Sequence, residues 1–160
     1  MIDGISIGGD VIVVVMGVDT EGNKHFLGIS QGSTENSVIV AECLNRLDER
    51  DIQFADRIVA VLDGAKALRK AVVERFGDRV EIQRCLIHKM RNIEAKLAKK
   101  HHDEFKEKIK QAYWLNEYNE AKAEMTIVLD WLKKISLNAA ESLEEGFDDL
   151  LTLHRIKMPP

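Results

Sequence analysis

The chain has 160 residues, of which 45% are hydrophobic and 31% charged, and its formal net charge is −4. This composition excludes a disordered or collagen-like chain, and the negative charge argues against a protein that holds nucleic acid by bulk charge alone. Because it has only two cysteines, no apolar run long enough to span a bilayer and no signal-peptide pattern, we expect a reduced, cytoplasmic protein.

The first third of the chain has the patterns of β-strands. Residues 2–7 form a short apolar alternation, residues 8–10 are a Gly-Gly-Asp turn signal, and residues 11–18 are rich in β-branched side chains. These patterns predict a hairpin. A second turn at 19–23 leads to a third strand at 24–30. We therefore predict an antiparallel meander of three strands.

Helical and strand patterns then alternate. Apolar residues at helical spacing predict a helix over 35–50, with Ser33 or Thr34 as its cap, and another over 65–77. Between them, residues 58–62 form a continuous apolar run, as expected for a strand buried on both faces. With one more short strand at Val80 to Gln83, the chain predicts an α/β fold, a mixed sheet with helices packed on it.

From Cys85 onward the pattern is helical throughout. The clearest stripe runs over 117–135, where apolar residues recur at steps of three and four. One helix, marked by Phe105, Ile109 and Ala112, precedes this stripe. Another, marked by Leu143, Phe147, Leu150 and Leu151, follows it.

The overall charge hides two opposed blocks in this helical part. Residues 84–110 hold nine basic side chains against four acidic ones, whereas residues 116–150 hold three basic against nine acidic. A basic stretch of this kind suits contact with nucleic acid. The simpler interpretation is a pair of solvated helices.

Two aspartates in the strand region have the pattern of a metal site. Asp3 shares a strand face with apolar residues, where a carboxylate is costly unless it is paired or bound to a metal. Asp63 ends the buried strand, and Gly64 after it lets the backbone approach a ligand closely. If the first and fourth strands are neighbours, as in an RNase H-like sheet, the two carboxylates meet and can hold Mg²⁺. The alternative is that Asp63 caps the next helix and Asp3 is a strand-end charge.

Cys85 and His88 form a third candidate, because a spacing of three brings them together at a helix start. A structural zinc site needs four ligands, and Cys43, His101 and His102 do not supply a matching spacing. His88 could instead approach a phosphate or orient a catalytic group, or the two could be a partly buried structural pair.

Three segments, in this order, resemble the catalytic domain of bacterial Mutator-type insertion-sequence transposases. They are Ile2-Asp3-Gly4, residues 62–68 (Leu-Asp-Gly-Ala-Lys-Ala-Leu) and residues 83–92 (Gln-Arg-Cys-Leu-Ile-His-Lys-Met-Arg-Asn). Residues 28–36, 140–147 and 153–155 are similar too, so the resemblance covers essentially the whole chain.

The resemblance implies an Asp-Asp-Glu enzyme that binds Mg²⁺ or Mn²⁺ in a two-metal site. An RNase H-like catalytic core, incomplete here, would span 1–97, and an all-helical insertion region would span 98–160. Asp3 and Asp63 match the first and second acids and would be both catalytic and metal-binding. Cys85 and His88 match the Cys/Asp-x-x-His motif and would belong to the catalytic set.

The implied partners are DNA, as transposon ends and target, and a second copy of the chain or a full-length transposase, without a membrane. On this resemblance Arg84, Lys89, Arg91 and Lys66 would contact DNA phosphates. The implied reaction is metal-dependent phosphodiester cleavage followed by strand transfer.

The third acid of the family, a Glu in an Asn-x-Ile-Glu-Ser-type segment, has no match, since none of Glu141, Glu144 and Glu145 fits that motif. The family's N-terminal DNA-recognition region has no match either. We therefore expect a transposase fragment that is weak or inactive alone. Two alternatives stay open: a non-catalytic remnant that binds DNA or a partner, and an RNase H-like nuclease that recruits an acid from 141–149.

Overall fold

The computed structural model describes residues 1–32, 37–50 and 52–159. The helix cap predicted at Ser33 or Thr34 lies outside these residues. The chain divides into two compact units, Met1–Ile82 and Gln83–Pro160, which are described separately below.

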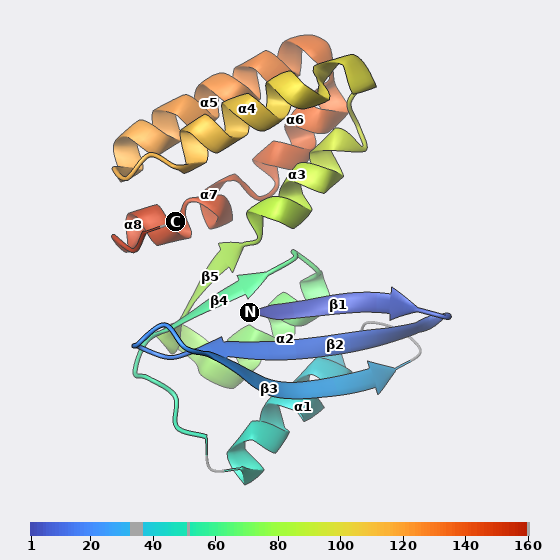
Figure 1. The fold of residues 1–160 in the computed structure, drawn as a ribbon, viewed down its shortest axis with the longest axis vertical. Helices are drawn as coiled ribbons and strands as arrows, with labels where there is room; N and C mark the ends of the chain where they lie inside the picture. The colour runs from blue at the N-terminus through green and yellow to red at the C-terminus, as the bar shows by residue number, and fades with distance from the viewer. Residues whose placement is uncertain (33–36, 51, 160) are drawn as a thin grey trace. The chain divides into compact units, whose positions relative to one another are not determined.

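The first unit opens with the three antiparallel strands that the sequence predicts (Figure 1): β1 (Ile2–Ile7), β2 (Asp10–Val18) and β3 (Lys24–Gly32). Gly8 and Gly9 make the tight turn between β1 and β2 with φ of 62° and 94°, a conformation that glycine adopts without steric cost.

Two further strands, β4 (Ile58–Leu62) and β5 (Val80–Arg84), extend the sheet in the order β3-β2-β1-β4-β5. The first and fourth strands are parallel neighbours, with Ile2 opposite Leu62. The sheet is therefore mixed and the fold is α/β, as the sequence predicts.

Helices α1 (Ser37–Glu49) and α2 (Lys66–Phe76) pack on one face of this sheet, and the short helix η1 (Gly77–Arg79) follows. Their contact with the sheet forms the core of the first unit. Its most deeply buried members include Val13, Val15, Val40, Leu44, Leu62, Leu68 and Val72.

The prediction that β4 is buried on both faces is only partly correct. Ala60 and Leu62 are buried in the helix-covered core, whereas Val59 and Val61 are half-buried. Alternate residues of a strand point to opposite faces, so Val59 and Val61 lie on the face that α1 and α2 do not cover.

The second unit is helical after the end of β5. Its helices are α3 (Leu86–Glu94), η2 (Lys99–His101), α4 (His102–Tyr113), α5 (Tyr118–Ile135), α6 (Leu137–Glu144), α7 (Phe147–Leu150) and α8 (Thr152–Arg155). Figure 1 shows α4 and α5 side by side along the unit. The predicted stripe of α5 is buried, with Ala121, Met125 and Leu132 at its centre.

One feature differs from the sequence prediction. The single helix expected around Leu143 to Leu151 is instead divided between α6 and α7, with a break at Gly146, and α8 follows from Thr152. A Cβ atom on Gly146 would lie 2.7 Å from Cε of Lys89. The break between α6 and α7 therefore lies where the backbone packs closely against the Lys89 side chain. The compact units divide at 82/83, because α3 packs into the helical core, while the division into a catalytic core over 1–97 and an insertion region over 98–160 stays a prediction.

No helix within the described residues is both long enough and apolar enough to cross a membrane.

Candidate active site

Asp3 lies on β1, the middle strand of the sheet, on the face away from α1 and α2. Its neighbour Ile2 is opposite Val15, which is buried in the helix-covered core, whereas Asp3 is opposite Val14. Because alternate residues face opposite sides, Asp3 points away from that core. The side chain is partly buried, and its Oδ1 atom is shielded from solvent.

Asp63 comes directly after β4 and holds the turn that leads into α2. Its Oδ1 accepts a hydrogen bond of 2.8 Å from the backbone N–H of Ala65, and Gly64 between them has φ of 102°. Asp63 thus stabilises the turn through one oxygen but is not the cap of α2 that the alternative predicted, since the flanking residue of that helix is Ala65. Within the described residues no hydrogen bond to Oδ2 of Asp63 is found.

The parallel pairing of β1 with β4 relates the two aspartates through their neighbours in the chain. Ile2 is opposite Leu62, and Asp3 and Asp63 directly follow these two residues, Asp63 in the turn after β4. Mg²⁺ takes one or two protein carboxylates and completes its shell with water and substrate oxygens. A carboxylate on β1 and one directly after β4 fit this donor set.

Nothing among residues 1–32, 37–50 and 52–159 forms a cluster of three or more His, Cys, Asp or Glu side chains suited to a metal.

Cys85 and His88 lie at the start of α3, in the second unit. Cys85 is the N-terminal flanking residue of the helix, and Nδ1 of His88 is 3.4 Å from its Sγ atom. Both side chains are partly buried. The spacing of three thus produces the local pair expected from one helical turn. The pKa of Tyr113 is raised mainly by burial of its side chain and secondarily by the charge interaction with Cys85.

Lys89 occupies a buried charge cluster in the second unit. Its side chain is fully buried, and Nζ donates hydrogen bonds to the Ser142 carbonyl at 2.6 Å and to Oε2 of Glu145 at 2.5 Å. Burial lowers the pKa of Lys89, against the opposing effect of its hydrogen bond with Glu145. We call Lys89, Ser142, Glu145 and Gly146 the Lys89 cluster.

Arg84 joins the edge of this cluster, with NH1 3.6 Å from Oε1 of Glu145 and a side chain only 10% exposed. Arg84 and Lys89 were both expected to contact DNA phosphates. A phosphate cannot reach an ammonium group that is buried and already paired with a carboxylate, so Lys89 does not fit that role, and Arg84 fits it poorly. Arg91 and Lys66, in contrast, are exposed.

Gln83 is a structural residue that the sequence analysis did not single out. Its buried side chain donates to the carbonyl oxygens of Arg84 and Leu150, at 2.9 and 3.0 Å, and accepts from the backbone N–H of Leu153 at 3.0 Å. The amide thus ties the end of β5 to α7 and α8. A buried glutamine leaves no periodic signal in the sequence, because its partners are backbone groups far along the chain.

The comparison with known families matches nearly the entire chain. The model of a family described as "Transposase, Mutator family" matches residues 3–158. The chain belongs to the Mutator family of transposases.

Curated Mutator-family relatives match both units. The transposase for insertion sequence element IS256 in transposon Tn4001 of Staphylococcus aureus is 27% identical over 138 residues, which cover 85% of this chain and 35% of the relative. The transposase for IS905 of Lactococcus lactis subsp. lactis is 29% identical over 147 residues, 91% of this chain and 36% of the relative. The transposase for ISRM5 of Rhizobium meliloti is 26% identical over 148 residues. The Mutator-family chain thus spans about a third of the length of these relatives.

Proposed function

We propose that this chain contributes the first two acids, Asp3 and Asp63, to the metal centre of a DNA transposase with an RNase H-like core. The observation that carries the proposal is the parallel pairing of β1 with β4, in which Ile2 and Leu62, the residues directly before the two aspartates, lie opposite each other. The strand order with β1 between β2 and β4 supports an RNase H-like sheet.

The reaction proposed for the complete protein is cleavage of a DNA phosphodiester and transfer of the strand. When bound, divalent metal activates a water or a DNA 3′-hydroxyl and stabilises charge on the departing oxygen. The contribution of Asp3 and Asp63 is to fix ligand oxygens, Asp3 on a central strand and Asp63 in a turn held by its own hydrogen bond to the Ala65 N–H. The turn at Gly64 keeps the Asp63 carboxylate anchored through the Ala65 N–H.

Exposed cations near these motifs are proposed to hold the DNA backbone. Lys66 begins α2, three residues after Asp63, and Arg91 lies on the exposed side of α3. Each phosphate contact adds affinity that falls with salt. Cys85 and His88 are proposed to position the start of α3 through their mutual contact.

We propose that this chain alone cleaves DNA weakly or not at all. The third acid that the resemblance implies has no match within these 160 residues. Two carboxylates can hold a hydrated ion, but a two-metal site needs further ligands.

The test is a titration of Mn²⁺ into the full chain, with free Mn²⁺ followed by electron paramagnetic resonance. Asp3→Asn and Asp63→Asn should each weaken Mn²⁺ binding at least tenfold, because each removes one of the two charged ligands. Asp130→Asn, an exposed aspartate on α5, is the matched control and should bind like the wild type.

Equal Mn²⁺ affinity in the wild type and in the two site variants would contradict the proposal. If the chain then still bound DNA, it would be the non-catalytic module instead. A parallel assay of DNA cleavage with Mg²⁺ tests the expected weakness: fast cleavage by this chain, lost in Asp63→Asn, would show that no further acid is needed.

A further inference from the structure

The basic stretch of residues 84–110 divides into paired and unpaired cations. Lys106 lies 2.9 Å from Glu94, and Lys108 lies 3.5 Å from Glu104. Lys96, Lys99 and Lys100 are exposed, and none of them makes an ion pair with another described residue. These three charges are therefore available to a partner.

The unpaired lysines gather with the end of another helix. The side chain of Ser136, directly after α5, donates a 3.0 Å hydrogen bond to the Lys96 carbonyl. The ring of His101, beside Lys99 and Lys100, lies 6.1 Å from the ring of Trp131 on α5. These contacts bring the last turn of α5, with its exposed Lys134, next to the turn between α3 and α4.

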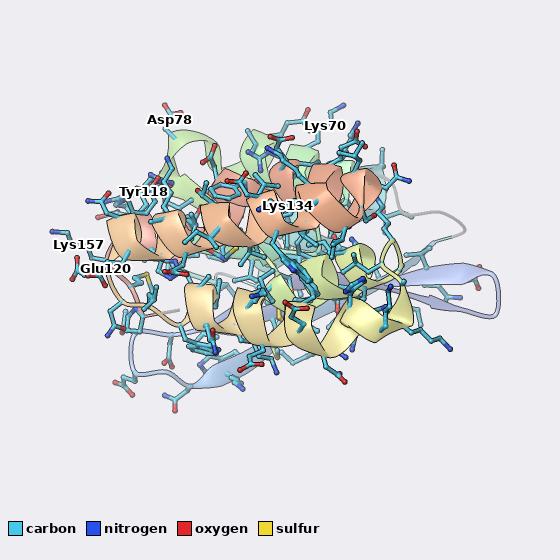
Figure 2. All side chains as sticks on the ribbon, turned by 90° about the horizontal axis from the view of Figure 1, so that it is seen from above. Lys70, Asp78, Tyr118, Glu120, Lys134 and Lys157 are labelled. Carbon is cyan, nitrogen blue, oxygen red and sulfur yellow. The ribbon has the colours of Figure 1, made fainter. Side chains whose placement is uncertain are left out.

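We call this group of exposed, unpaired lysines the lysine cap; its members are Lys96, Lys99, Lys100 and Lys134. Figure 2 labels Lys134, in the last turn of α5, and Tyr118, in the first turn of the same helix. The cap is thus built at one end of the α4–α5 pair by residues from separate segments of the chain.

Two glutamates near the cap are engaged by other cations. Glu144 lies 3.8 Å from Lys133, and Glu94 lies 2.9 Å from Lys106 and 3.8 Å from the ring of His102. These two glutamates therefore do not cancel charges of the cap. The exposed Asp103 and Asp130 lie within about one helical turn of Lys100 and Lys134, so the net charge of this area is lower than that of its four lysines alone. Trp131, at its centre, also has Nζ of Lys108 5.7 Å above its ring.

We propose that the lysine cap is a second contact surface for the DNA backbone, on the helical unit and independent of the aspartates. Four mobile ammonium groups in one small area suit a row of phosphates, and their contacts carry no base specificity. The choice of DNA as the polyanion rests on the proposed function. The position of the surface rests on the contacts of Ser136, His101 and Trp131.

The test is the affinity of the full chain for a short DNA duplex, measured by fluorescence anisotropy in EDTA over a range of salt concentrations. The cap variant replaces each of its four lysines by glutamine. The control variant makes the same change of net charge at exposed lysines elsewhere: Lys24, Lys110, Lys122 and Lys157.

The cap variant should bind at least tenfold more weakly than the control at low salt. Each phosphate contact contributes about 0.9 to the slope of log affinity against log salt, so the slope should fall by up to about 3–4. Circular dichroism should show that both variants keep the wild-type helix content, since all the changed side chains are exposed.

Equal loss in the two variants would overturn the proposal, because it would show a general effect of net charge. No DNA binding by the wild type would overturn it too, as would preferential binding of the wild type to vesicles of phosphatidylserine. Because the assay contains no free metal, these outcomes are distinguishable from failure of the metal site.

Discussion

The aspartate pair and the Lys89 cluster are both charged, and the same family resemblance points to both, yet they are built in opposite ways. Asp3 lies on β1 and Asp63 directly after the neighbouring strand β4, and Oδ2 of Asp63 accepts no hydrogen bond within the described residues. Lys89 is buried, and a carbonyl and a carboxylate accept its hydrogen bonds. The position of a charged residue in a family motif therefore does not show whether the residue contacts DNA or stabilises the fold. The burial of its side chain and its hydrogen-bond partners show this.

The same difference predicts opposite effects on stability. Breaking a buried ion pair leaves a charge without its partner and is costly. Two neighbouring carboxylates repel each other when no cation is bound, so this arrangement does not stabilise the fold.

Glu145→Ala should destabilise the chain most. It leaves the buried ammonium of Lys89 with only the Ser142 carbonyl. We expect a loss of about 3 kcal/mol in the free energy of unfolding, the lower end of the usual cost, because Glu145 itself is 59% exposed. Urea denaturation measures the loss. Glu144→Ala, which removes a surface pair with Lys133, is the control and should cost less than about 1 kcal/mol. Equal losses of unfolding free energy in the two variants would show that the pair of Lys89 with Glu145 stabilises the chain no more than a surface pair does.

Gly146→Ala should destabilise by about 1–2 kcal/mol, because the new methyl group meets the Lys89 side chain. Gly146 has φ of −122°, which alanine adopts freely, so the cost would come from packing alone. A double-mutant cycle in a Lys89→Ala background should reduce this cost. An unchanged cost in that background would place its cause elsewhere.

Lys89 should also give stability a pH dependence. Its pKa is lowered by burial from the ordinary 10.5, so between the lowered value and 10.5 the unfolded chain holds more protons at this position. The stability of the wild type relative to Lys89→Met should therefore increase as pH rises through that window. Lys110→Met, at an exposed position of α4, should follow the wild-type slope. A Lys89→Met slope that matched the wild type would contradict the buried, shifted ammonium.

Asp63→Asn should have the smallest effect, within about 0.5 kcal/mol of the wild type in metal-free buffer. Asparagine keeps an oxygen that can accept from the Ala65 N–H, and it removes one of two neighbouring negative charges. Thermal unfolding in EDTA measures the difference. A loss comparable with that of Glu145→Ala would show that the aspartate is primarily structural.

Local patterns were enough to predict most of the fold. The alternation of β1 and β2 and the Asp-Gly turn after β4 predicted the strands and singled out the two aspartates as candidates. The pairing of β1 with β4, which the sequence offered only as a condition, is confirmed, and a metal site at the two aspartates stays a prediction.

The Lys89 cluster was missed because charge counting treats every lysine as solvated. A signal did exist: Lys89 follows Leu86 by three residues and precedes Ile93 by four, so it lies on the apolar side of α3. Its partners Ser142 and Glu145 are more than fifty residues away. Gly146 was missed for the same reason, since its role depends on that distant side chain.

A crystal structure of the full chain grown with Mn²⁺ tests the central claim most directly, because anomalous scattering locates the ion. The account predicts an anomalous peak bound by the carboxylates of Asp3 and Asp63, absent from crystals of Asp63→Asn. A peak at other acidic side chains, with Asp3 and Asp63 free of metal, would contradict it.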